Sequence, residues 1–526
     1  MRGRMKISFV RKSNSKHVPD PPLKPVVRQS RPLKLLVAAS EAIPYAKTGG
    51  LADVAGALPS EFAKLGHEVI LLLPRYRELD QSGRRFRPLV TLPIHTPQGV
   101  VPAVIEEDVV PIGDRPEGLR VWAIANDAYF DRPGLYQESG LDYPDNLDRF
   151  VFFSRAIIEA MAYLRRERDW PTDLLHLHDW QTALCAVYLK TNDAARGDVS
   201  GVKTVLTIHN AGYQGMFPGT QFAKTGLAPS WFTPSGLEFY GSVNLLKGGI
   251  LFSDYLTTVS PTYAKEILTP EGGFGLDGVL RNRQGEFEGI LNGIDIDLWN
   301  PETDPHLPAP YTATNWQNKR VCKDALRREF RLPDADVPVI ALIGRMASQK
   351  GFDLMEEAIP KLITLDLQLV ILGTGERALE ERFKALHDRY PTKLGLRIGF
   401  DEGLAHRIEG GADMFLMPSQ YEPCGLSQLY SLRYGTIPIV RKTGGLADTV
   451  VPFSRRNPGP AHATGFHIEQ HTAKSLISTV EGALPVFQGI DTWKRLMENA
   501  MNVDVSWARS AKAYDRVFQS LTSQSI

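Results

Sequence analysis

Short, uninterrupted apolar runs that alternate with amphipathic segments are the feature of this sequence that most constrains its fold. The first run, Leu33–Ala39, is followed by a loop with two glycines and then by Leu51–Leu65, whose apolar residues have helical spacing. A second apolar run, Val69–Leu73, comes next. A strand that is apolar throughout is typically buried on both faces. This strand–loop–helix–strand unit therefore predicts a parallel sheet covered by helices.

The alternation continues in two series of predicted strands. The first series continues with Val121–Ala125, Leu174–Leu177, Thr204–Ile208 and Tyr255–Val259. A polar, turn-rich stretch, Leu291–Pro301, contains an Asn-Gly pair and ends this series. The second series consists of Val339–Ile343, Gln368–Leu372, Leu396–Ile398, Met414–Met417 and Ile437–Val440. We therefore predict an α/β fold of two doubly wound, Rossmann-like domains that face a central cleft, with a ligand at the carboxyl ends of the strands.

Length and composition agree with two globular domains. The 526 residues are too many for one ordinary core, and apolar (43%) and charged (23%) residues occur at fractions that exclude disordered and collagen-like chains. The formal net charge is zero, so we expect no nucleic-acid or membrane partner, and no apolar window of about 18 residues predicts a membrane span. Cys185, Cys322 and Cys424 are few and far apart, which favours a reducing cytoplasm over a disulfide framework.

Residues 1–32 differ from the rest of the chain. They hold nine Lys or Arg residues, one acidic residue (Asp20) and five prolines. They lack the apolar core of a secretory signal. We expect a disordered basic tail here, with an organelle transit peptide as the alternative.

One heptapeptide, Lys-Thr-Gly-Gly-Leu-Ala-Asp, occurs at both 47–53 and 442–448. Each copy follows a predicted strand and begins a predicted helix. Paired glycines let the backbone approach a ligand, and a helix N-terminus offers unpaired N–H groups and partial positive charge to an anion. A glycine pair before a helix is by itself more often only a turn, but the lysine and the duplication favour function. The candidate binding residues are Lys47, Gly49, Gly50, Thr443 and Gly444.

A second motif, residues 344–351, follows the predicted strand Val339–Ile343. Its Arg345 and Lys350 can converge on one anion, since arginine offers a planar fork and lysine a point charge. Such cations would act most strongly on a diphosphate that gains charge as it departs. A solvated basic loop is the alternative, and the position at the end of a strand favours the anion site.

Polar residues also follow three other predicted strands. Glu422 precedes a Pro-Cys-Gly turn and a helix start, where it can accept hydrogen bonds from sugar hydroxyls or simply cap the helix. His176 and His178 share one face of a strand, but no third residue has convincing spacing for a metal site. His209 ends the neighbouring strand, as a cleft residue or as a satisfied core histidine.

Together these motifs resemble the glycogen and starch synthase family of bacteria and plants, from about Leu33 to the C-terminus. The resemblance rests on Lys-Thr-Gly-Gly-Leu at 47–51, His-Asp-Trp at 178–180, Thr-Ile-His-Asn at 207–210, Asn-Gly-Ile-Asp at 292–295, Arg345 with Ser-Gln-Lys-Gly at 348–351, Glu-Pro-Cys-Gly-Leu at 422–426 and Thr-Gly-Gly-Leu at 443–446. Their common order makes it specific. It implies a GT-B fold and retaining transfer of glucose from ADP-glucose to the non-reducing end of an α-1,4-glucan such as glycogen, with release of ADP and with neither metal nor cofactor. Alanine at 52 and 55 favours the bacterial type, and with it ADP-glucose over UDP-glucose.

The resemblance also implies roles and boundaries. Residues 33–290 would form the acceptor-side domain with the Lys47 donor loop, 291–505 the donor domain, and 506–526 a helix that crosses back. Arg345 and Lys350 would hold the diphosphate, Glu422 would grip the glucose hydroxyls, and His209 would direct its backbone carbonyl at C1. The remaining substrate-binding residues would be Lys47, Gly49, Gly50, Tyr136, Asp179, Asn210, Gly375, Cys424, Gly425, Leu426, Thr443 and Gly444.

Three other functions remain open from the residues alone. Gly373-Thr-Gly375 through Ala378, with Asp401 further on, is a partial dinucleotide fingerprint and would suit an NAD-dependent oxidoreductase. The loop after the first strand lacks that fingerprint, so a turn that contacts a nucleotide is the better interpretation. A non-catalytic glucan-binding protein would not need both cations, and a phosphorylase-like enzyme would carry pyridoxal phosphate.

Overall fold

A computed structural model describes residues 31–113, 115–191, 197–454 and 461–523. By its contacts the chain divides into residues 1–31 and residues 32–526. All of the expected basic tail except Arg31 and Pro32 lies outside the described residues.

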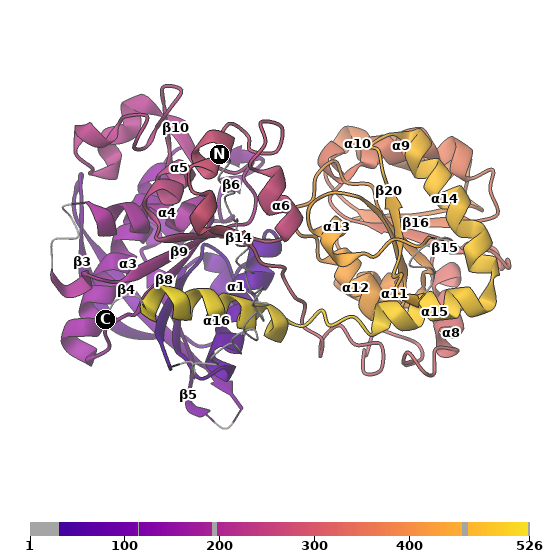
Figure 1. Cartoon of the computed structure of the whole chain (residues 1–526), viewed down its shortest axis with the longest axis horizontal. Helices are drawn as coiled ribbons and strands as arrows, with labels where there is room; N and C mark the ends of the chain where they lie inside the picture. The colour runs from indigo at the N-terminus through magenta and orange to yellow at the C-terminus, as the bar shows by residue number, and fades with distance from the viewer. Residues whose placement is uncertain (1–30, 114, 192–196, 455–460, 524–526) are drawn as a thin grey trace, which may run out of the picture. The chain divides into compact units, whose positions relative to one another are not determined.

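The first sheet has nine strands in the order β14-β13-β9-β8-β1-β2-β5-β4-β3 (Figure 1). Its strands from β14 to β5 are parallel, and β4 and β3 form an antiparallel hairpin at one edge. The strands are β1 (Lys34–Ala38), β2 (Glu68–Pro74), β3 (Arg87–Thr96), β4 (Gly99–Ile112), β5 (Arg115–Ala125), β8 (Leu174–His178), β9 (Lys203–Ile208), β13 (Tyr255–Thr258) and β14 (Phe287–Gly289). All six predicted strands of the first series are present, with ends that shift by a residue or two, except that β5 begins six residues earlier than predicted.

The sequence predicted neither the hairpin β3–β4 nor the three-residue strand β14 at the opposite edge of this sheet. The strands of the hairpin contain prolines, including Pro93 paired with Pro102, and several exposed positions, so their apolar residues are interrupted. Proline lacks a donor for the strand ladder and is tolerated near sheet edges. The hairpin therefore extends the sheet where only one face needs to be apolar.

The second sheet has six parallel strands in the order β17-β16-β15-β18-β19-β20. They are β15 (Val339–Ile343), β16 (Gln368–Gly373), β17 (Leu394–Ile398), β18 (Met414–Met417), β19 (Ile437–Arg441) and β20 (Phe466–Ile468). Five were predicted, and β20 was missed because a three-residue strand gives little pattern. Small additional strands form a three-stranded sheet of β10 (Met216–Pro218), β11 (Glu238–Phe239) and β12 (Ser242–Asn244), and a pair of β6 (Gln137–Glu138) and β7 (Leu141–Asp142).

Sixteen α-helices lie among the described residues. They are α1 (Gly50–Lys64), α2 (Asp127–Phe130), α3 (Asn146–Arg168), α4 (Asp179–Lys190), α5 (Leu245–Phe252), α6 (Pro261–Glu266), α7 (Asp277–Arg281), α8 (Asn318–Glu329), α9 (Phe352–Leu362), α10 (Arg377–Arg389), α11 (Glu402–Gly411), α12 (Ser427–Arg433), α13 (Gly444–Thr449), α14 (Ala473–Gln488), α15 (Ile490–Met501) and α16 (Trp507–Ser523).

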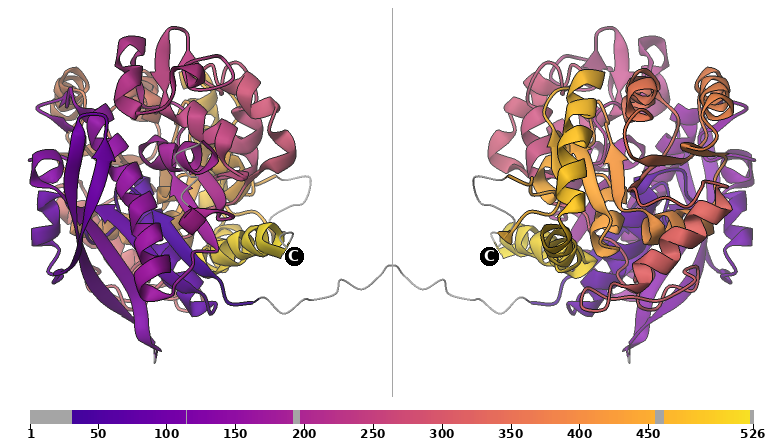
Figure 2. Two further views of the ribbon diagram at one scale, coloured as in Figure 1. Left: turned by 90° about the vertical axis from the view of Figure 1, so that its left-hand side faces the viewer. Right: turned by 90° about the vertical axis from the view of Figure 1, so that its right-hand side faces the viewer.

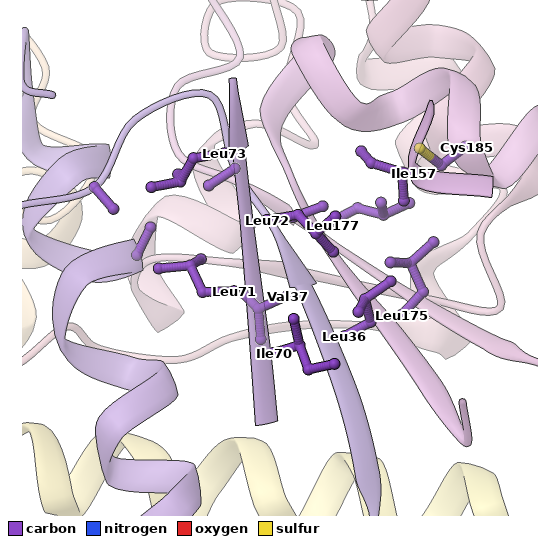
Figure 3. Packing of buried hydrophobic residues seen from close by; sticks show 14 of the residues in the cluster. Leu36, Val37, Ile70, Leu71, Leu72, Leu73, Ile157, Leu175, Leu177 and Cys185 are labelled. Atoms are coloured by element: carbon purple, nitrogen blue, oxygen red, sulfur yellow. The ribbon is translucent and has the colours of Figure 1, made fainter. Parts of the chain in front are cut away.

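Successive residues of the central strands pack into cores on opposite faces of the sheets. In β15, Ile340 and Leu342 belong to one apolar cluster, with α9 and α14, while Val339 and Ala341 belong to another, with α8 and α11. Helices accordingly cover both faces of the second sheet (Figures 1 and 2). In the first sheet, Leu36 on β1 and its register partner Leu175 on β8 lie side by side in the buried core (Figure 3). This two-sided burial explains why the strands have no polar alternation.

The last helix, α16, packs into the core of the first sheet. Its Phe518 ring lies 5.2 Å from the Phe62 ring on α1, measured between centroids, and Tyr514 and Phe518 are fully buried. Asp515 accepts a hydrogen bond from His67 at 3.1 Å if the ring carries its proton on Nε2. The chain thus returns to its first core after completing the second (Figure 1).

Candidate active site

Both sheets reverse their winding at one pair of strands, and the candidate residues follow those strands. In the first sheet β1 lies between β2 and β8, and in the second β15 lies between β16 and β18. Loops that leave such a pair run in opposite directions and expose the strand ends to a ligand. Glu41 follows β1, Asp179 follows β8, Arg345 follows β15, and Glu422 follows β18.

The first glycine loop is organised around the carboxylate of Glu41, which is buried. Glu41 Oε2 accepts hydrogen bonds from the N–H groups of Thr48, at 2.6 Å, and Gly49, at 3.1 Å, and Oε1 accepts from the hydroxyl of Thr48 at 2.9 Å. The hydroxyl of Tyr136 donates to Glu41 Oε1 at 2.8 Å and lies 2.7 Å from Ser40 Oγ. The predicted Tyr136 and Gly49 therefore belong to one polar cluster.

Lys47 lies beside this cluster but is not part of it. Its Nζ pairs with Asp53 of the same heptapeptide at 2.8 Å, and 48% of its side chain is exposed. An exposed ion pair contributes little stability, so the lysine can exchange this partner for a ligand at low cost.

Asp179 begins α4 with a left-handed backbone (φ 55°) and is buried. Its Oδ1 accepts the backbone N–H of His209 at 2.7 Å, which fixes the end of β9 against the start of α4. Burial raises the pKa of Asp179 to about 7, and the hydrogen bond from the His209 backbone opposes that rise. The predicted Asp179 and His209 are thus joined directly.

The histidines of this region form a buried chain. His178 Nδ1 lies 2.9 Å from His209 Nε2, and His176 Nε2 lies 2.7 Å from Thr207 Oγ1. Burial lowers the pKa values of His176 and His209 to about 3, so both rings are neutral near pH 7. Among the described residues, no group of three or more His, Cys, Asp or Glu side chains is arranged to hold a metal ion.

In the second sheet the predicted Lys350 and Glu422 form an ion pair. Lys350 Nζ lies 2.9 and 2.7 Å from the two carboxylate oxygens of Glu422, whose side chain is 7% exposed, and Ser419 Oγ donates to Oε2 at 3.1 Å. Gly351, at φ 76°, turns the chain from Lys350 into α9, and a Cβ there would collide with the carbonyl of Pro418. The loop after β15 is therefore held against the loop after β18 by the Lys350–Glu422 ion pair and by the close packing of Gly351 on Pro418.

Arg345 belongs to the same pair of loops but remains exposed. Its guanidinium donates to Gln349 Oε1 at 3.3 Å, and Gln349 Nε2 donates to the carbonyl of Tyr421 at 3.0 Å. Arg345 is thus linked to the segment that carries Glu422, although the two predicted cations do not share a partner.

The turn after Glu422 is held by backbone geometry. Gly425 has φ 75°, and Gln428 Nε2 donates to the carbonyls of Cys424 and Gly425 at 2.9 and 3.1 Å. Burial raises the pKa of the Cys424 thiol to about 12, so the thiol stays protonated. A Cβ on Gly50 would lie 3.9 Å from Leu426 Cδ1, which brings the first glycine loop against this turn.

Asn210 lies beside the Glu422 segment. A Cβ on its neighbour Gly212 would lie 3.6 Å from the Tyr421 hydroxyl, and the Asn210 side chain interacts with that hydroxyl. The Tyr421 ring also contacts Phe274 edge-on, at 5.5 Å between centroids.

Two other predicted positions contact carboxylates. Gly375 N–H donates to Glu380 Oε1 at 2.9 Å. Thr443 Oγ1 and Gly444 N–H both donate to Glu266 Oε1, at 3.0 and 2.9 Å. Asp401, the acidic residue of the partial dinucleotide fingerprint, instead caps α11: its Oδ1 accepts a hydrogen bond from the N–H of Leu404 at 2.8 Å.

Sequence reasoning missed Glu41, Glu266 and Tyr421 as members of this region. Glu41 had a usable signal, because it is a polar residue just past the end of a buried strand. Glu266 had none, since it is one of many charged residues on helices and only its contact with α13 distinguishes it.

Comparison with known proteins decides the family. The starch synthase catalytic domain model matches residues 34–282, and the glycosyl transferases group 1 model matches residues 324–485. Glycogen synthase of Syntrophotalea carbinolica is 43% identical over 93% of this chain and 98% of its own length. Glycogen synthase 2 of Nitrosococcus oceani is 44% identical, with the same shares covered. The chain belongs to the glycogen and starch synthase family.

A solved structure agrees with this membership. The catalytic domain of starch synthase IV from Arabidopsis thaliana, bound to ADP and acarbose, superposes with a TM-score of 0.84 at 33% identity, over 94% of this chain and 100% of that one. The sucrose-phosphate synthase of Thermosynechococcus elongatus, at 16% identity and a TM-score of 0.56, shares the fold. The chain is therefore a glycosyltransferase with the predicted GT-B fold. No helix among the described residues is long and apolar enough to cross a membrane.

The raised pKa of Asp179 predicts a pH-dependent stability. In the unfolded chain the carboxyl titrates near 3.8, and in the folded protein near 7. Between these values the folded state holds a proton that the unfolded state has lost, so this contribution is full below 3.8 and is lost as the pH rises through about 7. Asp179→Asn keeps an oxygen for the His209 N–H but cannot titrate. Its stability relative to the unmodified protein should therefore rise with pH across this window, by up to about 1.4 kcal/mol per pH unit.

Denaturant unfolding at several pH values measures this difference. Asp254→Asn is the control: burial raises the pKa of Asp254, but hydrogen bonds from Lys190 and Thr204 outweigh that effect and lower it. Its difference should stay flat above about pH 5, where the carboxyl is ionised in both the folded and the unfolded states. Parallel curves for the Asp179 variant and the unmodified protein would show that the carboxyl is ionised throughout.

Proposed function

We propose that this chain transfers glucose from ADP-glucose to the non-reducing end of an α-1,4-glucan such as glycogen, with retention at C1 and release of ADP. The observation that carries the proposal is the ion pair of Lys350 and Glu422 where β15 and β18 diverge. A cation beside a carboxylate suits a site that must hold a charged leaving group and a sugar together, which supports the proposal. The ADP and acarbose of the related starch synthase IV support both substrate classes.

The chemistry requires charge separation. The bond from C1 to the diphosphate breaks, and the sugar passes through an oxocarbenium-like transition state before C1 bonds to the acceptor O4. Arg345 and Lys350 would stabilise the negative charge on the departing ADP, and Glu422 with the Cys424–Leu426 backbone would hold the glucose hydroxyls. Retention is compatible with a covalent intermediate and with same-face attack.

The first sheet would supply the sugar-side environment. His209 is neutral near pH 7 because burial lowers its pKa to about 3. A neutral ring adds no positive charge near C1, so its backbone carbonyl can face the developing cation without opposition. Asp179 would orient His209 through the backbone hydrogen bond, and Asn210, Tyr136 and Lys47 would complete the pocket.

The remaining predicted contacts fit less directly. Gly49 and Gly375 already donate to Glu41 and Glu380, so a phosphate that bound these N–H groups would have to displace the carboxylates. Thr443 and Gly444 donate to Glu266. We assign Gly50 and Gly375 to the donor, residues 33–290 to the acceptor side, and residues 291–505 to the donor side, with 506–526 returning to the first domain.

We also propose a cytoplasmic location. Cys185, Cys322 and Cys424 are all free and buried. Unpaired cysteines suit a reducing compartment, where a nucleotide sugar would also be available.

Incorporation of labelled glucose into glycogen tests the proposed function. The purified chain should incorporate label from ADP-glucose, with a kcat/KM at least about tenfold above that with UDP-glucose, a difference of about 1.4 kcal/mol. No incorporation from either donor would contradict the function, and a preference for UDP-glucose would contradict the assigned donor.

Lys350→Ala tests the cation at the leaving group. It removes a charge that acts in the transition state and leaves Glu422 without its partner, so kcat should fall by about 10²-fold or more. Lys361→Ala is the control. Lys361 on α9 is 56% exposed, and its ion pair with the exposed Glu481 is long, at 3.8 Å, so its loss should have little effect. Turnover near that of the unmodified enzyme in a folded Lys350→Ala protein would exclude this role.

The duplicated heptapeptide offers a matched pair of lysines. Lys47→Gln should raise KM for ADP-glucose or lower kcat, because Lys47 is beside the first glycine loop. Lys442→Gln, at the equivalent position, should leave the donor kinetics unchanged, since Lys442 is exposed and pairs with Glu469 at 3.2 Å. Equal kinetics for the two variants would mean that Lys47 has no donor role.

A further inference from the structure

The two copies of the heptapeptide bind carboxylates in the same way, but the carboxylates come from different places. In the first copy, Thr48 and Gly49 donate to Glu41, seven or eight residues earlier in the chain. In the second copy, Thr443 and Gly444 donate to Glu266, which lies on α6 and 177 residues away from Thr443. The second copy therefore connects the two halves of the chain.

α6 makes two more hydrogen-bonded contacts with the second half. Thr262 donates to both carboxylate oxygens of Asp448, the last residue of the second heptapeptide, from its backbone N–H and its hydroxyl at 2.7 Å each. Ser260, which caps α6 and is fully buried, donates its hydroxyl to the carbonyl of Pro423 at 2.6 Å. We call the contacts of Ser260, Thr262 and Glu266 with Pro423, Asp448, Thr443 and Gly444 the α6 clasp.

The clasp reaches Glu422 through the backbone of α13. Gly445 N–H donates to the carbonyls of Glu422, at 3.2 Å, and Pro423, at 3.1 Å. Gly444 has φ 43°, and a Cβ there would collide with the carbonyl of Glu422. The start of α13 is thus in direct contact with the Glu422 backbone. Contacts that hold α13 in place therefore also hold the backbone that carries the Glu422 side chain.

We infer that Glu266 is a positioning residue for the glycosyl transfer: from the first sheet, through Thr443 and Gly444, it holds the Glu422 segment in place. This rests on the proposed function of Glu422. The geometry assigns the hydroxyl and N–H of the second heptapeptide to this clasp rather than to the donor. A small misplacement of a substrate-holding group lowers turnover steeply, because the reacting atoms must meet within a narrow range of distance.

Glu266→Ala and Glu266→Gln test the inference together. Alanine removes the acceptor, so kcat should fall about tenfold or more, while KM for glycogen should change less than about twofold. Glutamine keeps an acceptor oxygen for Thr443 and Gly444 and should restore kcat to within about threefold of the unmodified enzyme. Glu469→Ala, which removes the carboxylate that pairs with the exposed Lys442, should change neither. Full kcat in folded Glu266→Ala protein would overturn the inference.

A double-variant cycle separates positioning from general loss of stability. Thr443→Val removes the side-chain donor to Glu266 and leaves the Gly444 N–H, so Glu266→Ala with Thr443→Val should cost little more kcat than Glu266→Ala alone. Additive losses would mean that the two residues act independently, against the clasp. If Glu266→Ala does not fold, Thr262→Val, which keeps its backbone donor, carries the same test: it should lower kcat at temperatures well below its unfolding midpoint, and an unchanged kcat there would contradict the clasp.

Amide hydrogen exchange tests the α6 clasp without an activity measurement. The peptide that contains Gly444 and Gly445 should exchange faster in Glu266→Ala than in the unmodified protein, while the peptide that contains Thr48 and Gly49 should not change. Equal exchange in the Gly444 peptide would refute the clasp even if the chain is active. Absence of glucose transfer by the unmodified chain would instead refute the proposed function and leave the exchange result to stand.

Discussion

The reversal of winding at β1 and β15 is the constraint on which the rest of the structure depends. Strands buried on both faces must be parallel and covered by helices, and the crossovers must leave opposite sides of the starting strand. Only there do neighbouring loops diverge and leave strand ends uncovered. Glu41, Asp179, Arg345 and Glu422 all follow the strands at these points, so the topology alone places these candidate residues at the uncovered strand ends.

Carboxylates at loop N–H groups then give the exposed loops a definite shape. Glu41, Glu266 and Glu380 each accept from a threonine hydroxyl and a glycine N–H. Such charge-assisted hydrogen bonds satisfy donors that would otherwise need water or a ligand. Threonine hydroxyls and glycine N–H groups can also donate to phosphate oxygens. We propose that similar loops order the protein internally and bind the donor.

Prediction from sequence succeeded where a pattern is local. Continuous apolar runs identified eleven strands of the two sheets, because burial on both faces leaves its mark within five or six residues. It missed β3 and β4, whose apolar residues are interrupted by prolines and exposed positions, and the three-residue strands β14 and β20. Among the candidate residues, Lys350 with Glu422 and Asp179 with His209 prove to be in contact, although they are 72 and 30 residues apart. No spacing rule links them.

By itself, the sequence determined the parallel strands of the two sheets and the loops that carry polar residues, because each depends on residues that are near one another in the chain. The order of several short motifs along the chain indicated the family. Tertiary structure decided which partner each polar group took. Lys350 pairs with Glu422 from another loop, and the second heptapeptide donates hydrogen bonds to Glu266 on a helix that is distant in the chain. The physical reason is that a buried carboxylate needs hydrogen-bond donors close to it in space. Which donors are close depends on the fold and not on their separation along the chain.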